Sequence, residues 1–120
     1  MLNDFLEEYP DSRFREKAVS ALREAQSRLI QREFDAARLY FKAGEYKSAL
    51  VYYKFIKENF PEVNWSESDR YRLAICFLET GDRESARAMF EELVANAVSA
   101  RIKVGAQRYL NRLNNARMPN

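Results

Sequence analysis

Apolar residues recur at helical spacing along this chain, and Pro and Gly divide them into segments. Residues 2–9 follow the i, i+3, i+4, i+7 pattern of one helix face, and Pro10 ends this short helix. No Pro or Gly interrupts residues 11–43, and one apolar stripe runs through them: Phe14, Ala18, Ala21, Leu22, Ala25, Leu29, Ala36, Ala37, Tyr40 and Phe41. We therefore predict one long helix over about 12–43, in preference to two helices with a bend near Gln31.

Shorter helices are predicted beyond this long one. Gly44 supplies the left-handed turn that ends the long helix, and the following stripe stops at Pro61. Ser66 or Ser68 caps a further helix, which Gly81 ends. Two more segments follow at helical spacing. The apolar positions of these four segments are Tyr46, Ala49, Leu50, Tyr53, Ile56, Leu73, Ala74, Phe77, Leu78, Ala86, Met89, Phe90, Leu93, Val98, Ile102, Ala106, Tyr109, Leu110 and Leu113.

The same ten-residue phrase occurs twice, 37 residues apart. The segments from Gly44 to Tyr53 and from Gly81 to Phe90 both read Gly, acid, two variable residues, Ser-Ala, three variable residues and an aromatic. A phrase that returns in register marks one structural unit used twice. We therefore predict an all-α, tetratricopeptide-like solenoid of antiparallel helix pairs, with about five to six helices. The alternative is a helical bundle in which the phrase recurs by chance.

Each position of the phrase has a physical reason. The glycines permit the tight turn, the alanines are small where paired helices pass closest, and the aromatics fill the space between repeats. Pro61 ends the second helix of the first pair. The structural positions are thus Gly44, Gly81, Ala49, Ala86, Tyr53, Phe90 and Pro61. Because a tetratricopeptide repeat has 34 residues, we place an insertion of about three residues in the loop over 62–65.

We expect one domain over residues 1–120. Its parts are the tail of a preceding repeat (1–10), a first repeat with the long helix (11–61), a second repeat (66–96) and a C-terminal capping helix (97–114).

Composition narrows the function. The chain has no histidine and one cysteine, which excludes Ser-His-Asp and Cys-His catalysis, a Cys/His zinc site and an internal disulfide. We expect Cys76 to be a small buried hydrophobe and the chain to need no cofactor. A net charge of +2 predicts no strong attraction to nucleic acid. We find no apolar run as long as a membrane span and no signal peptide at the start.

Two stretches carry a family resemblance. Residues 9–14 (YPDSRF) match a Tyr-Pro-x-Ser-x-aromatic phrase, and residues 28–46 run without a breaker into a Gly-x-aromatic turn. The ending Asn59-Phe60-Pro61 also fits. On these residues, the chain from about Phe5 to Asn96 resembles the C-terminal half of the BamD (ComL-like) family of outer-membrane protein assembly lipoproteins. The second copy departs from the general repeat pattern at Arg83, where an aromatic is usual.

The resemblance implies a non-catalytic periplasmic scaffold of the outer-membrane β-barrel assembly machinery. Its C-terminal half is expected to dock on the POTRA region of the BamA-type barrel component, with other assembly lipoproteins as further partners. It also implies that the parent protein lies at the periplasmic face of the outer membrane through a lipid anchor, while this chain is itself soluble. A leader, a lipidated cysteine and two earlier repeats are not matched here, so a fragment and a short natural relative both stay open.

The concave side of the first helix in each pair is the predicted binding surface. Phe34, Phe41 and Tyr71 are its candidate anchors, since exposed aromatics anchor protein interfaces. Arg38 is a candidate salt-bridge partner for an acidic group on the docked protein. The alternatives are packing within the chain for the aromatics and a solvated charge for Arg38. The full set of concave positions is Gln31, Phe34, Arg38, Phe41, Ser68, Tyr71, Ile75 and Leu78.

Two further features are candidates for binding. Trp65 lies in the predicted loop, where it either reaches a partner or covers the edge of the core. Residues 97–120 contain several basic residues and no acid. Arg101, Arg108 and Arg112 in this segment either form a solvated face or contact an acidic protein surface or anionic lipid headgroups.

An adaptor and an enzyme are the alternatives to a scaffold of this machinery. A generic tetratricopeptide adaptor, for example of the Tol-Pal coordinator type, would bind another protein or peptide. An enzyme would need a carboxylate pair such as Glu91 and Glu92, but neighbours in a helix diverge by about 100° and cannot share one substrate atom.

Overall fold

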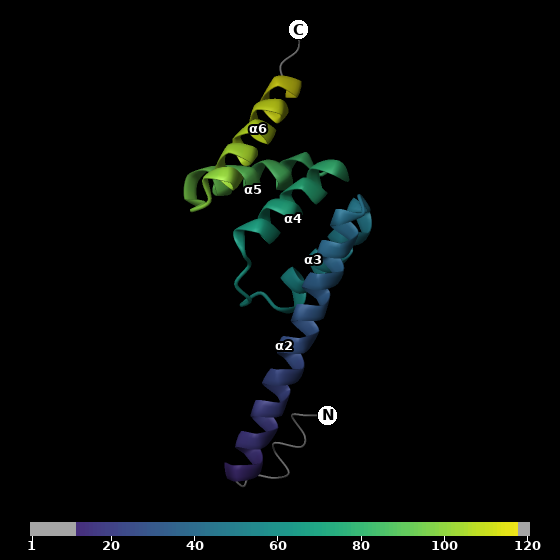
Figure 1. The fold of residues 1–120 in the computed structure, drawn as a ribbon, viewed down its shortest axis with the longest axis vertical. Coiled ribbons are helices and arrows are strands. Elements are labelled where there is room, and N and C mark those ends of the chain that lie inside the picture. Colours follow the sequence, from purple (N-terminus) through teal and green to yellow (C-terminus); the bar gives the residue numbers. More distant parts are fainter. Residues whose placement is uncertain (1–11, 118–120) are drawn as a thin grey trace.

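The computed structural model describes residues 12–117, and these residues form five helices (Figure 1). They are α2 (Ser12–Lys42), α3 (Tyr46–Asn59), α4 (Glu67–Glu79), α5 (Arg83–Asn96) and α6 (Ala100–Arg117). The predicted long helix is confirmed as α2, which has 31 residues. The predicted short helix over 2–9 and the repeat tail over 1–10 lie outside the described residues.

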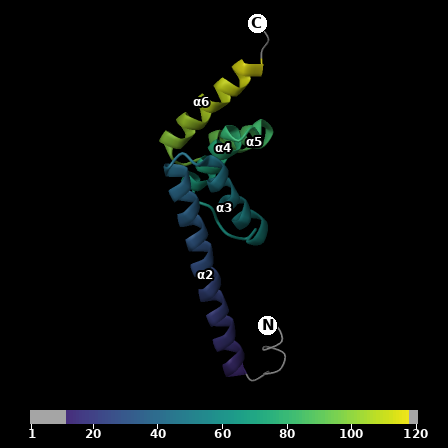
Figure 2. The same ribbon diagram turned by 90° about the vertical axis from the view of Figure 1, so that its right-hand side faces the viewer.

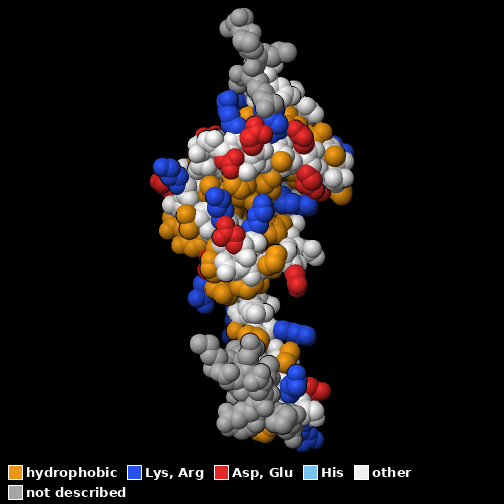
Figure 3. All heavy atoms as spheres, turned by 180° about the vertical axis from the view of Figure 1, so that it is seen from behind, with side chains coloured by type: hydrophobic (Ala, Val, Ile, Leu, Met, Phe, Trp, Pro, Cys, Tyr) orange, Lys and Arg blue, Asp and Glu red, His pale blue; other side chains and the backbone are white. Residues whose placement is uncertain are grey.

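The helices stack in sequence order as an α-solenoid. The hairpin of α2 and α3 packs on the hairpin of α4 and α5, and α6 packs on α5 and α4. Figures 1 and 2 show that α3 covers the upper half of α2, while the lower half extends beyond it. Seen from behind, hydrophobic side chains gather over the middle of the molecule, with Lys and Arg side chains among them (Figure 3). The all-α, tetratricopeptide-like prediction is confirmed.

Both hairpin turns are built in the same way. Gly44 and Gly81 have φ of 77° and 96°, the left-handed conformation that glycine adopts at little cost. In each turn the glycine N–H donates three residues back, to the carbonyl of Phe41 or Leu78, at 3.0 and 3.2 Å. The backbone N–H of the residue after each glycine donates to the carbonyl five residues before it, at 2.9 and 2.8 Å. These paired bonds make a Schellman motif, so the glycine turns predicted from the phrase are confirmed.

The repeated small and large positions lie in the core. Ala49 and Ala86 are fully buried, as are Ala37 and Ala74 on the facing helices. The predicted space-filling aromatics, Tyr53 and Phe90, are fully buried as well. Close helix contact therefore depends on alanine, and the contact between successive pairs depends on the aromatic.

The helix starts follow short-range capping rules. Ser66, rather than Ser68, caps α4, because its Oγ accepts a hydrogen bond from the backbone N–H of Asp69 at 3.1 Å. Asp82 caps α5 in the same manner by accepting from the N–H of Ser85. Glu45 precedes α3 without a side-chain cap.

The two links between helix pairs differ in length. α3 ends at Asn59, just before Pro61, and residues 60–66 connect it to α4, whereas residues 97–99 suffice between α5 and α6. The longer link contains the predicted insertion and Trp65. Among helices within residues 12–117, none combines the length and apolarity needed to cross a bilayer.

Candidate functional site

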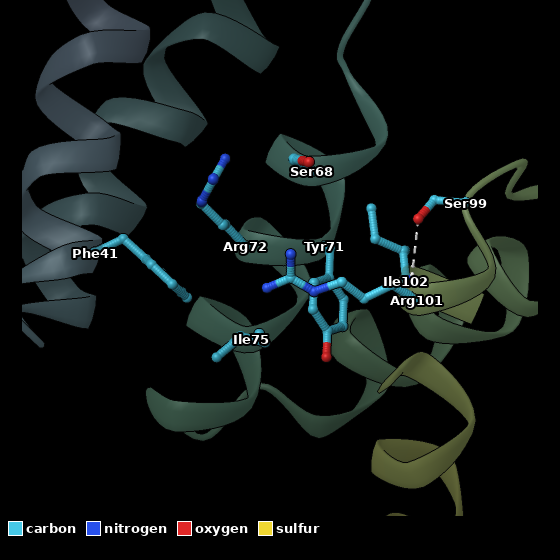
Figure 4. Close-up of a pocket in the computed structure, with 8 residues that line it drawn as sticks. All are labelled: Phe41, Ser68, Tyr71, Arg72, Ile75, Ser99, Arg101 and Ile102. Carbon is cyan, nitrogen blue, oxygen red and sulfur yellow. Dashed lines mark hydrogen bonds between the residues drawn. The ribbon is translucent and has the colours of Figure 1, made fainter. Parts of the chain in front are cut away.

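A groove of about 320 Å³ lies between α2, α4 and α6 (Figure 4). Phe41 reaches in from the end of α2, Tyr71 and Ile75 come from α4, and Arg101 and Ile102 come from α6. Ser68, Arg72 and Ser99 complete the lining. The groove therefore combines aromatic and aliphatic side chains with two guanidinium groups and two serine hydroxyls.

The α6 wall of this groove is held by Glu67. Its carboxylate accepts hydrogen bonds from the backbone N–H groups of Val98 and Ser99, at 2.6 and 3.0 Å. These two bonds lower the pKa of Glu67. Ser99 in turn accepts from the N–H of Ile102 at 3.3 Å (Figure 4). The first turn of α6, which carries Arg101, is thus fixed against the first turn of α4.

A second hollow of about 190 Å³ continues from the groove along α6. Its lining is Tyr71, Gly105, Arg108, Tyr109 and Arg112, so Tyr71 borders both spaces. The Arg112 guanidinium lies 5.5 Å from the centre of the Tyr109 ring, a cation–π distance. Three arginines of α6 therefore face the same side as the groove.

Gly105 makes room for Tyr71 in this second hollow. A Cβ atom at position 105 would overlap the Tyr71 hydroxyl oxygen and lie 2.9 Å from Cζ of the ring. The ring makes edge contacts with Phe90 and Tyr109, with centroids 6.2 and 6.0 Å apart. The position of Tyr71 between the two hollows thus depends on the missing side chain of Gly105.

A buried carboxylate joins α2, α3 and α4 beside the groove. Asp69 on α4 is 1% exposed and accepts from Arg38 on α2 at 3.0 Å (Nε) and 2.6 Å (Nη2). Tyr53 on α3 donates its hydroxyl at 2.7 Å. Ser66 and Arg72 donate at 2.9 and 3.2 Å. Together these hydrogen bonds compensate the negative charge of Asp69, which would otherwise be buried without partners.

The network sets the ionisation of its members. Burial alone would raise the pKa of Asp69, but the hydrogen bonds from Arg38, Tyr53 and Ser66 outweigh it and hold that pKa below its ordinary value. Burial, together with the bond to Asp69, raises the pKa of Tyr53. The bond to Asp69 also raises the pKa of Arg38. With these partners in place, Asp69 is therefore ionised at neutral pH.

Two of the predicted binding residues, the anchor Phe34 and the salt-bridge candidate Arg38, are engaged inside the chain. The expectation that Phe34 is exposed is wrong: it is 6% exposed, and its ring packs edge-on against Trp65 and Tyr53 at 5.1 and 6.3 Å. Arg38 pairs with Asp69 instead of standing free for a partner. These interior contacts form because α4 and the link before it lie close to α2: α4 supplies the Asp69 carboxylate, and the link supplies the Trp65 ring.

The other predicted residues divide between three places. Phe41, Tyr71 and Arg101 come together in the groove, with the predicted concave residues Ser68 and Ile75. Arg108 and Arg112 line the adjoining hollow. Trp65 is half-buried and packs on Phe34 and Tyr53, so it covers the edge of the core, while it also lines a separate pocket in the loop region.

Sequence reasoning missed Asp69, Arg72 and Gly105. A signal for Asp69 was available, because Ser66-Glu67-Ser68-Asp69 has the Ser-x-x-acid spacing of a capping box. Arg72 and Gly105 carry no comparable local signal. Cys76 is buried, as expected, and burial raises the pKa of its thiol to about 12. Within residues 12–117, Cys, Asp and Glu do not gather in groups that could hold a metal ion.

Comparison with known proteins gives one assignment. No curated protein matches this chain. The model of the YfiO family, described as outer membrane lipoproteins, matches residues 1–89, which is 89 of 120 residues and includes α2, α3, α4 and the first half of α5. The chain therefore belongs to the YfiO family of outer membrane lipoproteins.

Proposed function

We propose that this chain is a non-catalytic scaffold segment of the outer-membrane β-barrel assembly machinery. In this proposal it docks on the POTRA region of a BamA-type barrel component at the periplasmic face of the outer membrane. The parent protein would be held there by a lipid anchor. Membership in an outer membrane lipoprotein family and the tetratricopeptide-like fold support an interaction role of this kind.

The groove between α2, α4 and α6 is the observation that carries the proposal. Its half-buried aromatics Phe41 and Tyr71 offer apolar area, and the exposed Arg101 stands at its edge. Protein interfaces are typically enriched in aromatics and arginine at their centre. The groove therefore suits a folded partner that presents an apolar patch with acidic side chains beside it.

The α6 arginines add a charge component to the docking. Arg101, Arg108 and Arg112 are exposed and line two adjoining hollows, so an acidic partner surface would meet several cations along one helix. Such complementarity mainly raises the rate of association and fixes the orientation of the partner. Substituting these arginines should weaken docking while leaving the core intact.

A binding measurement with the isolated POTRA domains tests the proposal. We expect the chain to bind them saturably, and the double variant Arg101→Glu/Arg108→Glu to bind at least about tenfold more weakly, since close interfacial charge pairs couple by more than 1 kcal/mol. Lys103→Glu is the matched control, because Lys103 is exposed on α6 but lines neither hollow. Absence of POTRA binding by the parent protein, or equal losses in both variants, would contradict this function.

The second candidate is a tetratricopeptide adaptor for another protein or peptide, as in the Tol-Pal coordinator type. The same groove would serve it, because its mixture of aromatic and guanidinium groups is not specific to one fold of partner. Recovery of a different periplasmic protein on the chain, with loss in Arg101→Glu/Arg108→Glu and no POTRA binding, would favour this adaptor.

A further inference from the structure

A separate pocket, of about 350 Å³, lies at the long link between the two helix pairs. Pro61, Val63 and Trp65 of the link form one side, and Leu73 of α4 and Met89 of α5 form the floor. Lys57 and Arg70 are its two charged lining residues. We call this space, lined by these seven residues, the Trp65 pocket. It does not share a lining residue with the groove at α6.

The walls of the Trp65 pocket are fixed by contacts with the hydrophobic core. The Trp65 ring packs against Phe34 and Tyr53, with centroids 5.1 and 5.3 Å away. Leu73 is 2% exposed and belongs to the core. A pocket whose walls are already fixed loses little conformational entropy when it is filled, which favours specific binding of an apolar side chain.

The extra residues of the link create this pocket. Pro61, Val63 and Trp65 all come from the seven residues over 60–66, whereas the second link has the three residues 97–99. The insertion predicted over residues 62–65 falls within the link that forms this wall. The longer link therefore supplies three lining residues to this pocket.

Both charged side chains that line the pocket are cations, and Arg70 is incompletely hydrogen-bonded. Arg70 donates from Nη1 to Glu92 across a long 3.4 Å, and its Nε is buried without an acceptor among the described residues. Both members of this ion pair are more than a third exposed, so the pair itself is weak. A guanidinium in this state gains from a new carboxylate partner, and Lys57 adds a second positive charge nearby.

We propose that the Trp65 pocket binds an extended segment of a partner protein in which one large apolar side chain is flanked by carboxylates. The apolar side chain fills the space between Trp65, Leu73 and Met89. A neighbouring carboxylate of the segment replaces Glu92 as the hydrogen-bond acceptor of Arg70, and the positive charge of Lys57 attracts it. The scaffold would then hold two protein partners at once, one at the groove and one at this pocket.

Fluorescence tests the proposal directly, because Trp65 is the single tryptophan of the chain. The probe is the blocked peptide acetyl-Ser-Asp-Phe-Asp-Ser-amide, and the controls are the same peptide with both Asp replaced by Asn or with Phe replaced by Ala. We expect a saturable change of Trp65 emission with a Kd below about 1 mM. Each control peptide should bind at least about tenfold more weakly, since it lacks either the charged hydrogen bonds or the apolar anchor.

Variants separate this site from the groove. Arg70→Gln should reduce probe binding about tenfold, as expected for loss of a charge-assisted hydrogen bond. Lys47→Gln, an exposed lysine at the other end of the helix that carries Lys57, is the matched control and should bind normally. Arg101→Glu/Arg108→Glu should bind the probe normally even though POTRA docking is impaired. No saturation up to about 5 mM, or equal binding of all three peptides, would overturn the proposal.

Discussion

The Arg38 guanidinium donates two hydrogen bonds to the Asp69 carboxylate, 3.0 Å from Nε to Oδ1 and 2.6 Å from Nη2 to Oδ2. This pair connects the first helix of the first repeat to the first helix of the second. Thirty-seven residues later, Arg38 is replaced by Ile75, and the Tyr53 that completes the network is replaced by Phe90. One repeat therefore makes this contact with charges, and the next repeat has apolar side chains at the same positions.

Removing the acid alone should be costly. Asp69→Ala leaves the Arg38 charge and the Tyr53 hydroxyl without their acceptor, and breaking a buried pair from one side typically costs about 3–5 kcal/mol. We expect about 3 kcal/mol, the lower end, because the Arg38 side chain is 39% exposed and can turn to water. Urea denaturation monitored by circular dichroism measures the free energy of unfolding.

The apolar replacement of the whole network is the matched comparison. Arg38→Ile/Tyr53→Phe/Asp69→Leu gives this interface the residues of the next repeat at two of its positions. We expect it to recover most of the loss seen in Asp69→Ala, since well-packed hydrophobic replacements of buried ion pairs are often neutral or stabilising. A triple variant as unstable as Asp69→Ala would show that the charges themselves are required.

The pH dependence follows from the lowered pKa of Asp69. A depressed folded-state pKa means that the unfolded chain takes up the proton first, at about 3.9, as pH falls. The contribution of Asp69 to stability is therefore complete above that value and is lost as pH falls through the folded-state pKa, by up to about 1.4 kcal/mol per pH unit. We expect the stability difference between the native chain and Asp69→Asn to shrink from pH 5 to pH 2.

Comparing the two proteins isolates Asp69. Glu67 and Asp82 also have lowered pKa values, but they titrate in both proteins and cancel in the difference. A stability difference that stays constant over this range would contradict the assigned ionisation.

Short-range features were predictable from the sequence. The glycine turns, the breaker-free helix α2 and the buried alanines follow from residues within one or two helical turns of each other. The role of Asp69 and the burial of Phe34 do not follow in this way because their partners are far away along the chain: Arg38 lies 31 residues from Asp69, and Trp65, which packs on Phe34, lies in the link before α4. Helical periodicity says which face a residue occupies, but not which side chain will stand opposite.

The candidate site likewise depends on contacts between residues that are distant in sequence. The groove residues Phe41, Tyr71 and Arg101 were chosen one at a time, from helix faces and from charge. Their meeting in one groove depends on how α6 crosses α4, which Glu67 fixes through its bonds to Val98 and Ser99. A carboxylate that binds the start of a helix distant in sequence produces no periodic pattern, so the sequence does not predict its role.

The two turn glycines should respond alike to substitution. Nothing lies within 4 Å of a Cβ atom added at Gly44 or Gly81, so the cost of alanine is backbone strain alone. A left-handed residue with a Cβ costs about 1–2 kcal/mol, and we expect each Gly→Ala variant to lose that much. Gly44→Asn should lose less, because asparagine adopts this conformation more readily. Thermal unfolding measures the midpoints, which should fall in the order Gly, Asn, Ala at position 44. Equal midpoints would refute the turn geometry.

Gly105 and Tyr71 should show strong energetic coupling. Alanine normally stabilises a helix interior by about 1 kcal/mol relative to glycine, but at position 105 its Cβ would overlap the Tyr71 hydroxyl. In a Tyr71→Ala background that obstacle is gone, so Gly105→Ala should be stabilising there, and neutral or destabilising when Tyr71 is present. A double-mutant cycle measured by urea denaturation should give a coupling of at least about 1 kcal/mol. Additive effects would mean that Tyr71 does not hold its place through Gly105, and the wall shared by the groove and the adjoining hollow would then need another support.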